Sequence, residues 1–309
     1  MPSSLPETVR ELIEWGADRL DAAGLVFGHG TDNAYDEAAM LVLSALQLDM
    51  NLPPGDLDAR VDPADVRQAT ELLDMRITTR KPAAYLTHEA WFAGMPFYVD
   101  ERVLVPRSPI AELIENRFVP WIRPERVARI LDLCTGSGCI ACACAREFPT
   151  AYVDASDLSA DALSVARRNI ARHGLEQRVT LLQSDLFAAI TADNYDIIIS
   201  NPPYVPREEV GQLPSEFCHE PSLALAAGED GLDIAIQILN NAHRYLSETG
   251  ILVVEVGHTW PVLEAVFPDV PFTWLEFEFG GEGVFLLGRD QLDTFRDSFE
   301  RVAGQRMTT

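Results

Sequence analysis

The apolar positions of the chain follow a helical period from Pro6 to about Thr79. Residues three and four apart share one face of a helix, so these positions form stripes that a core can cover. The first stripe consists of Val9, Leu12, Ile13 and Leu20, and the second of Ala38, Leu41, Val42, Ala45 and Leu46. Asn51-Leu-Pro-Pro-Gly55 interrupts the period, which resumes over residues 66–77. The pattern predicts a small helical domain.

A segment of β-forming residues follows, over positions 85–105. Ala93-Gly94-Met95-Pro96 lies at its centre, and apolar and aromatic residues flank it on both sides. Glycine between two such runs is typical of a hairpin. We therefore divide the chain into a helical domain at 1–82, a β-hairpin linker at 83–106 and a second domain at 107–309.

Strand and helix patterns alternate from about Arg129 onward. Five short apolar runs predict strands at 130–133, 152–156, 179–183, 195–200 and 250–256. Between the second and third runs, Ser159 has the position of a helix N-cap and Gly174 that of a helix stop. Such alternation is typical of a parallel sheet with helices on both faces, an α/β fold. Residues 272–279 alternate apolar and acidic side chains and turn through Gly280-Gly-Glu-Gly283 into 284–287, which predicts a C-terminal antiparallel hairpin.

Composition narrows the class of protein. The chain has 309 residues, of which 47% are apolar, enough for two domains with buried cores. No apolar run approaches the roughly 18 residues of a membrane span. The N-terminus lacks the basic and apolar segments of a signal peptide. We expect a soluble cytoplasmic protein.

The net charge indicates the kind of partner. Asp and Glu number 48 against 24 Lys and Arg, which gives a formal net charge of −24. Such a chain repels polyanions, so we expect no direct nucleic-acid binding and no membrane partner. A basic partner would be attracted. An acidic bias of the whole proteome would give the same charge.

Three of the five cysteines crowd into Cys139-Ile-Ala-Cys142-Ala-Cys144. Zinc sites pair Cys-x-x-Cys units with each other or with closely spaced histidines, and no histidine of this chain has that spacing. We expect small, buried, reduced thiols and no metal.

Two glycines stand where the first strand passes into a helix, in Ile130-Leu-Asp-Leu-Cys-Thr-Gly-Ser-Gly138. Gly136 and Gly138 carry no side chain that would keep a ligand away from the backbone. Asp157 ends the second strand about 20 residues further on, where a carboxylate accepts hydrogen bonds from both hydroxyls of a ribose. The spacing is typical of a site for a nucleotide or nucleoside cofactor.

Three other residues favour S-adenosyl-methionine over a dinucleotide. Position 141 is Ala141, so the strict G-x-G-x-x-G of dinucleotide enzymes is incomplete. Asp132 precedes the glycines and suits a cofactor that carries an ammonium group and no pyrophosphate. Asp185 follows the third strand, where it is placed for the amino group of adenine. Because the carboxyl ends of parallel strands meet at one edge of a sheet, Asp132, Asp157 and Asp185 predict one site.

The loop Asn201-Pro202-Pro203-Tyr204 follows the buried fourth strand. Each proline restricts its own backbone and that of the residue before it, so the loop is stiff. It fixes two acceptors, the Asn201 side-chain oxygen and the Pro202 carbonyl, which match the two donors of a planar NH₂ group. Tyr204 is placed to cover the flat face of that group. The loop predicts methyl transfer to a carboxamide or nucleobase nitrogen.

With this loop, Asp132-Leu-Cys-Thr-Gly-Ser-Gly138 resembles the motifs of class I, S-adenosyl-methionine-dependent methyltransferases, which have a Rossmann-like fold. Three further segments narrow the resemblance to protein-(glutamine-N5) methyltransferases: Leu104-Val-Pro-Arg-Ser-Pro-Ile-Ala-Glu-Leu113, His219-Glu-Pro221 and Gly228-Glu-Asp-Gly-Leu232. The resemblance covers nearly the whole chain. The resemblance implies that residues 201–204 hold the glutamine amide and that residues 1–82 recognise the substrate. It also implies cofactor contacts from Thr135, Gly136, Ser137, Gly138, Asp157, Asp185 and Asn201. Leu186 stands in the adenine-binding loop where related enzymes often have Trp.

Within that family, the chain resembles the branch that methylates a glutamine of ribosomal large-subunit protein three. Pro106-Arg-Ser-Pro-Ile110 replaces the Pro-Arg-Pro-Glu-Thr of the branch acting on release factors. Trp274-Leu-Glu-Phe277 and Gly280-Gly-Glu-Gly-Val-Phe285 also match the ribosomal branch. The expected partner is then a free, basic ribosomal protein. Three alternatives stay open at this point: methylation of release factors, methylation of adenine N6 in nucleic acid, and cofactor binding without catalysis.

Overall fold

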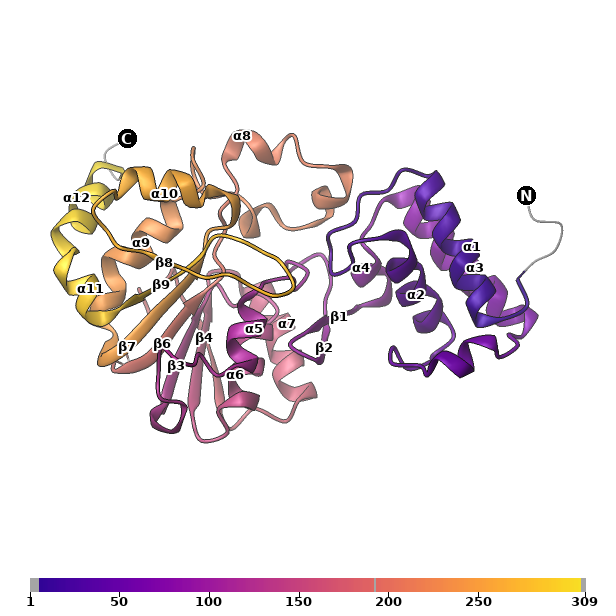
Figure 1. The fold of residues 1–309 in the computed structure, drawn as a ribbon, viewed down its shortest axis with the longest axis horizontal. Coiled ribbons are helices and arrows are strands. Elements are labelled where there is room, and N and C mark those ends of the chain that lie inside the picture. The colour runs from indigo at the N-terminus through magenta and orange to yellow at the C-terminus, as the bar shows by residue number, and fades with distance from the viewer. Residues whose placement is uncertain (1–5, 192, 307–309) are drawn as a thin grey trace. The chain divides into compact units, whose positions relative to one another are not determined.

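The computed structural model describes residues 6–191 and 193–306 and divides the chain into two compact units (Figure 1). The first unit comprises Met1–Ala90, Val99–Glu101 and Pro214–His219. The second comprises Trp91–Tyr98, Arg102–Leu213 and Glu220–Thr309. No helix in the described ranges combines the length and the apolar character that a membrane span requires.

The first unit is helical, as its apolar period predicts. Thr8 caps its first helix through a reciprocal capping box with Glu11. The stripe residues Val9, Leu12, Ile13 and Leu20 of that helix are buried, as are Ala38, Leu41, Val42 and Ala45 of the next. The elements are α1 (Val9–Ala22), α2 (Ala34–Ala45), η1 (Pro54–Asp58), α3 (Pro63–Thr79) and α4 (Ala83–Thr87).

One short segment far along the sequence belongs to this helical unit. Pro214–His219 contains η3 (Ser215–His219), and its Glu216 carboxylate accepts the Val26 N–H at 3.1 Å and pairs with Arg80 at 3.1 Å. The three predicted domains are continuous stretches of sequence, so they cannot include a segment that joins the helical unit from residues 214–219. The division into 1–82, 83–106 and 107–309 therefore stays a prediction about functional domains.

The expected hairpin is present as β1 (Glu89–Phe92) and β2 (Met95–Tyr98), which form a two-stranded sheet. Ala93 and Gly94 form its turn with φ values of 46° and 65°. Two successive residues in the left-handed region match the right-handed twist of the flanking strands.

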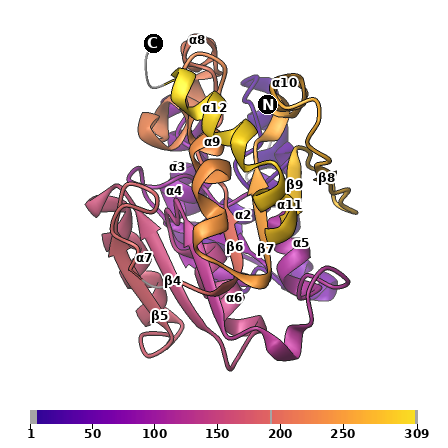
Figure 2. The same cartoon turned by 90° about the vertical axis from the view of Figure 1, so that its left-hand side faces the viewer.

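The second unit is built on a seven-stranded sheet in the order β5-β4-β3-β6-β7-β9-β8 (Figure 2). The first five strands in this order are parallel, β9 is antiparallel to β7, and β8 is antiparallel to β9. The α/β class and the antiparallel end of the sheet are thereby confirmed. The strands are β3 (Arg129–Leu133), β4 (Tyr152–Asp157), β5 (Val179–Gln183), β6 (Tyr195–Ser200), β7 (Leu246–Glu255), β8 (Thr273–Trp274) and β9 (Val284–Gly288).

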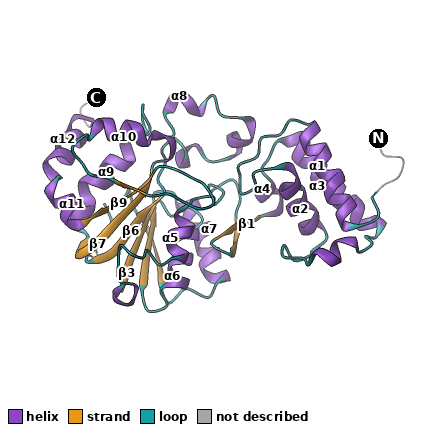
Figure 3. Cartoon of the chain, viewed as in Figure 1, coloured by secondary structure: helices purple, strands orange, loops and turns teal. Residues whose placement is uncertain are grey.

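Helices cover both faces of this sheet (Figure 3). Neighbouring side chains of β6 point to opposite faces of the sheet. Ile197 and Ile199 belong to the core with α5, α6 and α7, whereas Ile198 belongs to the core with α9 to α12. The main helices are α5 (Ile110–Glu115), α6 (Cys139–Glu147), α7 (Ala160–Arg172), α9 (Asp233–Asn241), α10 (Trp260–Val266), α11 (Arg289–Thr294) and α12 (Arg296–Arg306). The short ones are η2 (Pro124–Arg126), α8 (Arg207–Val210), η4 (Ser222–Ala224), η5 (Ala242–Arg244) and η6 (Gly257–Thr259).

The strand expected over residues 272–279 is much shorter than its alternation predicts. Only Thr273 and Trp274 belong to β8, and the chain then leaves the sheet as a loop over residues 275–283. The Glu112 carboxylate takes the N–H groups of Glu278 and Phe279 at 2.9 and 3.0 Å. A side chain of α5 thus replaces the strand partner that alternation alone assumed.

Candidate functional site

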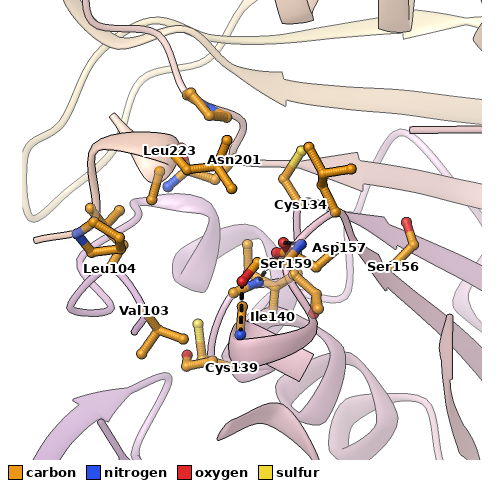
Figure 4. A pocket seen from close by; sticks show the side chains of 18 of the residues that line it. Val103, Leu104, Cys134, Cys139, Ile140, Ser156, Asp157, Ser159, Asn201 and Leu223 are labelled. Atoms are coloured by element: carbon orange, nitrogen blue, oxygen red, sulfur yellow. Dashed lines mark hydrogen bonds between the residues drawn. The ribbon is translucent and has the colours of Figure 1, made fainter. Parts of the chain in front are cut away.

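A cavity of about 180 Å³ opens at the carboxyl edge of the parallel strands (Figure 4). Its wall includes the residues that follow β3, β4, β5 and β6, together with the segments 102–108 and 221–226. In Figure 4, Val103 and Leu104 lie on one side of the cavity and Asp157 and Ser159 on the other. The end of a parallel sheet is where open α/β folds bind their ligands.

The two glycines of the turn between β3 and α6 have different roles. Gly136 has a φ of +55°, and a Cβ built there would meet nothing within 4 Å, because the position faces the cavity. Gly138 has a φ of +78°, and its Cβ would lie 3.1 Å from the Ala166 Cβ of α7. Gly138 does not line the cavity. It permits close packing of α7, whereas Gly136 keeps the ligand side open.

Asp157 is the acid that the fold aims into the cavity. Its Oδ2 accepts the Gly136 N–H and its Oδ1 accepts the Ser159 N–H, both at 2.9 Å. Ser159 is the N-cap of α7, as its sequence position predicts. Burial raises the pKa of Asp157 above its ordinary value, against the lowering effect of these backbone hydrogen bonds. Each carboxylate oxygen retains acceptor capacity, which fits the two adjacent hydroxyls of a ribose.

Asp185 and Leu186 line the same cavity from the loop after β5. The Ser184 hydroxyl fixes this loop, because it donates to the Leu186 carbonyl at 2.7 Å and accepts the Ala189 N–H at 2.9 Å. Asp185 is exposed and Leu186 is half-buried. The loop therefore offers one carboxylate and one apolar side chain, which suits the amino group and the ring of a purine.

Asp132 lies behind the glycine turn and does not line the cavity. Its side chain is fully buried, and its Oδ2 accepts the Thr135 hydroxyl at 2.5 Å and the Ala141 N–H at 3.1 Å. Its Oδ1 has no hydrogen-bond partner in the described part of the chain, and burial raises its pKa to about 7. Asp132 Oδ2 thus supports the turn, and the expected contact between Asp132 and the cofactor ammonium stays a prediction. Thr135 and Ser137, by contrast, do line the cavity.

The loop after β6 presents two acceptors that the protein itself leaves unused. Asn201 lines the cavity, and its amide has no hydrogen-bond partner among residues 6–191 and 193–306. The Pro202 carbonyl also accepts no hydrogen bond within these ranges, although Pro202 is buried. Pro203 lines the cavity next to Asn201.

The Tyr204 side chain is not among the residues that line the cavity, so its expected place over the target group stays a prediction. Its hydroxyl donates to Glu255 Oε1 at 3.1 Å, and its ring leaves no room for a Cβ at Gly257, which would lie 2.6 Å from Cε2. Burial and the neighbouring Glu255 raise the pKa of the phenol. Tyr204 therefore anchors the loop to the end of β7.

A set of polar residues that the sequence analysis did not assign ties the loops around the cavity together. The Ser108 hydroxyl donates to Glu255 Oε2 at 2.5 Å. Arg107 donates to both oxygens of Glu220, at 2.6 and 2.8 Å, and Glu220 Oε1 also accepts the Val105 N–H at 3.1 Å. One signal was present in the sequence, since Glu255 interrupts the apolar run over residues 250–256.

The clustered cysteines are reduced and buried. Cys139, Cys142 and Cys144 are free thiols on α6, and burial raises the pKa of Cys139 to about 12. Thiols with a raised pKa are poor nucleophiles and poor metal ligands. Among the residues that the structure describes, no group of three or more His, Cys, Asp or Glu side chains is placed to hold a metal ion.

Comparison with known proteins agrees with this architecture. Residues 116–230 match the family model described as the methyltransferase small domain. The catalytic domain of hMettl16, solved in complex with the MAT2A 3′UTR hairpin 1, aligns with 81% of this chain and 89% of its own, at a TM-score of 0.50 and 16% identity. That likeness concerns the fold alone. Fold, glycine turn and Asp157 together define a class I, S-adenosyl-methionine-dependent methyltransferase.

Two curated relatives specify the family. The ribosomal protein uL3 glutamine methyltransferase of Bordetella pertussis is 51% identical over 93% of this chain and 97% of its own length. The protein of the same name from Neisseria gonorrhoeae is 50% identical over 92% of this chain and 95% of its own length. The chain belongs to the family of ribosomal protein uL3 glutamine methyltransferases. It is an S-adenosyl-methionine-dependent protein glutamine methyltransferase.

Proposed function

We propose that this protein transfers the methyl group of S-adenosyl-methionine to the side-chain amide nitrogen of a glutamine in ribosomal protein uL3. Family membership supports the substrate. The observation that carries the chemistry is the pair of unused acceptors, Asn201 Oδ1 and the Pro202 carbonyl, on a stiff loop at the cavity.

The residues around the cavity fit the cofactor. S-adenosyl-methionine supplies an electrophilic methyl group on a sulfonium centre when it is bound. Asp157 offers two acceptors for the ribose hydroxyls, and Asp185 lies at the rim for the adenine amino group. Gly136 leaves open the space that a Cβ would fill. Thr135 and Ser137 supply hydroxyl groups to the same wall.

The loop after β6 orients the nucleophile. An amide nitrogen is a weak nucleophile because its lone pair is conjugated with the carbonyl. Asn201 Oδ1 and the Pro202 carbonyl accept its two hydrogens and hold them on one side, so the nitrogen lone pair faces the methyl donor. The hydrogen bonds strengthen as the nitrogen becomes pyramidal and positively charged, which is transition-state stabilisation. The new N–C bond forms as the donor's S–C bond breaks, so that S-adenosyl-homocysteine would be the leaving group. The methylated cation is strongly acidic and loses its extra proton to solvent, so no strong base is required.

Recognition of the protein substrate is assigned to the predicted helical domain, residues 1–82, and to the negative charge of the enzyme. A chain with a net charge of −24 attracts a basic protein before that protein is covered by ribosomal RNA. We therefore propose free uL3, rather than the assembled ribosome, as the substrate.

The test is methylation of purified uL3 taken from cells that lack the enzyme. The expected product is one methyl group heavier, and tandem mass spectrometry locates the methyl group on a glutamine side chain. Asn201→Ala should lower kcat by about 10²-fold, because one transition-state hydrogen bond is lost. Asp157→Asn should instead weaken S-adenosyl-methionine binding in a calorimetric titration. Asn241→Ala, an amide on α9 bonded to the Gln237 carbonyl, is the matched control.

A release factor assayed in parallel separates the two branches of the family. Methylation of the release factor with none of uL3 would refute the proposed substrate. A wild-type kcat for Asn201→Ala would refute the proposed role of the loop.

A further inference from the structure

The loop over residues 275–283 carries an apolar side chain in an unusual position. Phe279 is 85% exposed, which is the largest fraction among the large apolar side chains in the described ranges. A fully exposed phenylalanine forgoes the stabilisation that burial of its ring would bring. The ring is therefore available for contact with a partner.

The backbone of this loop is held firmly, so the exposure of Phe279 is imposed by the fold. The two oxygens of Glu112 on α5 accept the N–H groups of Glu278 and Phe279. A Cβ at Gly281 would lie 2.8 Å from the Pro109 ring, and one at Gly283 would lie 2.0 Å from the Gly257 carbonyl oxygen. The loop is thus packed between α5 and the end of β7, and Figure 1 shows it passing beside α5.

The loop lies at the same edge of the sheet as the catalytic cavity. Val284, which follows it, pairs with Glu255 at the end of β7. The Glu255 carboxylate holds both Tyr204 of the catalytic loop and Ser108 of the cavity wall. Through this one carboxylate the loop is linked to the wall of the cavity.

The charge of the loop specifies the chemistry of its partner. Glu276, Glu278 and Glu282 are exposed around Phe279, and no Lys or Arg occurs between residues 270 and 288. Carboxylates beside an apolar ring repel an anionic membrane surface and a second copy of the same loop. They fit a peptide segment that combines Lys or Arg with an apolar side chain.

We propose that loop 275–283 is a docking surface for the segment of the substrate protein that flanks the target glutamine. Phe279 packs on an apolar side chain of that segment, and Glu276, Glu278 and Glu282 pair with its basic residues. This inference rests on the proposed function and adds the surface that selects the substrate.

The test is steady-state kinetics of the full-length enzyme with purified uL3. Phe279→Ser should raise KM for uL3 about tenfold and leave kcat and the Kd of S-adenosyl-methionine unchanged, because the ring touches neither the cavity nor the cofactor wall. The triple variant E276Q, E278Q, E282Q should also raise KM and should reduce its dependence on salt concentration. Tyr152→Ser is the matched control, since Tyr152 is 63% exposed at the opposite, amino end of β4.

The outcomes separate this inference from the function on which it rests. An active wild-type enzyme with an unchanged KM in Phe279→Ser would refute the docking surface and leave the function standing. Failure of the wild-type enzyme to methylate uL3 would refute both. A Phe279→Ser variant that changes oligomeric state in gel filtration without a change in KM would show contact between two copies of the chain, and would likewise overturn the proposal.

Discussion

Glu255 provides a quantitative test of how burial controls this site. The residue ends β7, is 5% exposed, and accepts hydroxyl hydrogen bonds from Ser108 and Tyr204. Burial outweighs these two hydrogen bonds and the nearby Arg107, and raises the pKa of the carboxyl from 4.5 to about 7. Glu255→Gln keeps the size of the side chain and one acceptor but removes the ionisation.

The sign of the effect follows from proton linkage. The folded state binds the Glu255 proton more tightly than the unfolded state does. Below about pH 4 both states are protonated, and the group adds no penalty. As the pH rises through 4.5 towards 7, the unfolded state ionises first and the free energy of unfolding falls. Each pKa unit corresponds to about 1.4 kcal/mol, so above pH 7 the ionised carboxylate costs the fold about 3 kcal/mol.

Urea denaturation of the wild type and of Glu255→Gln at pH 5 and pH 8.5 measures this cost. We expect the variant to be more stable by about 3 kcal/mol at pH 8.5 and within about 1 kcal/mol of the wild type at pH 5. Asp132 also has a raised pKa, but it is present in both proteins and cancels in the difference. Glu248→Gln, an exposed position on the same strand, is the control. An equal pH dependence of the wild type and Glu255→Gln would refute the reasoning.

Three further substitutions test the loops around the cavity. Gly138→Ala should lower the free energy of unfolding by about 2 kcal/mol, because of its φ of +78° and its contact with Ala166. Gly136→Ala should lower the free energy of unfolding by about 1 kcal/mol. It should also weaken S-adenosyl-methionine binding more than tenfold in calorimetry, because the new Cβ enters the cavity. Equal affinities of the Gly136 and Gly138 variants would contradict the different roles of the two glycines. Arg107→Lys should lower the free energy of unfolding by about 1–3 kcal/mol, because a lysine makes only one of the two hydrogen bonds to buried Glu220. Thermal denaturation measures this loss of stability, with Arg296→Lys as the control because Arg296 forms an exposed ion pair with Glu300. Equal losses of stability in the Arg107 and Arg296 variants would contradict the prediction.

The network around Glu255 also gives a structural role to Ser108, one of the residues on which the resemblance to the ribosomal branch is based. Position 108 is Ser in this chain. The Pro-Arg-Pro-Glu-Thr motif of the release-factor branch has proline at the matching position. The Ser108 hydroxyl donates to Glu255 and accepts the Ile110 N–H at 3.2 Å. A proline can make neither hydrogen bond. Ser108 thus lies in the wall of the cavity and fixes the end of β7.

Sequence reasoning succeeded where a feature is local to the backbone. Strands β5 and β6 begin and end where their apolar runs do, and Ser159 caps α7 as its position predicts. Side-chain spacing of two or of 3.6 residues is a property of the strand or helix itself, so it is visible without the rest of the chain. The glycine turn and Asp157 belong to the same class, because a strand end delivers them directly to the edge of the sheet.

The direction of individual side chains was decided only by the tertiary structure. Asp132 and Tyr204 belong to the expected motifs, yet Asp132 is buried behind the turn and Tyr204 is bonded to Glu255. The strand expected to continue after Trp274 is absent from the described residues, although apolar and acidic side chains alternate there. The N–H groups of Glu278 and Phe279 instead donate to Glu112, which is far away in sequence.

The sequence by itself therefore determined the order of strands and helices, the glycine turn and the stiff loop at Asn201, since each depends on neighbouring residues. The tertiary structure decided which polar groups face the cavity and which are used up inside the protein. The reason is that the partner of each such group comes from a distant part of the chain, as Ser108 and Glu255 do across 147 positions.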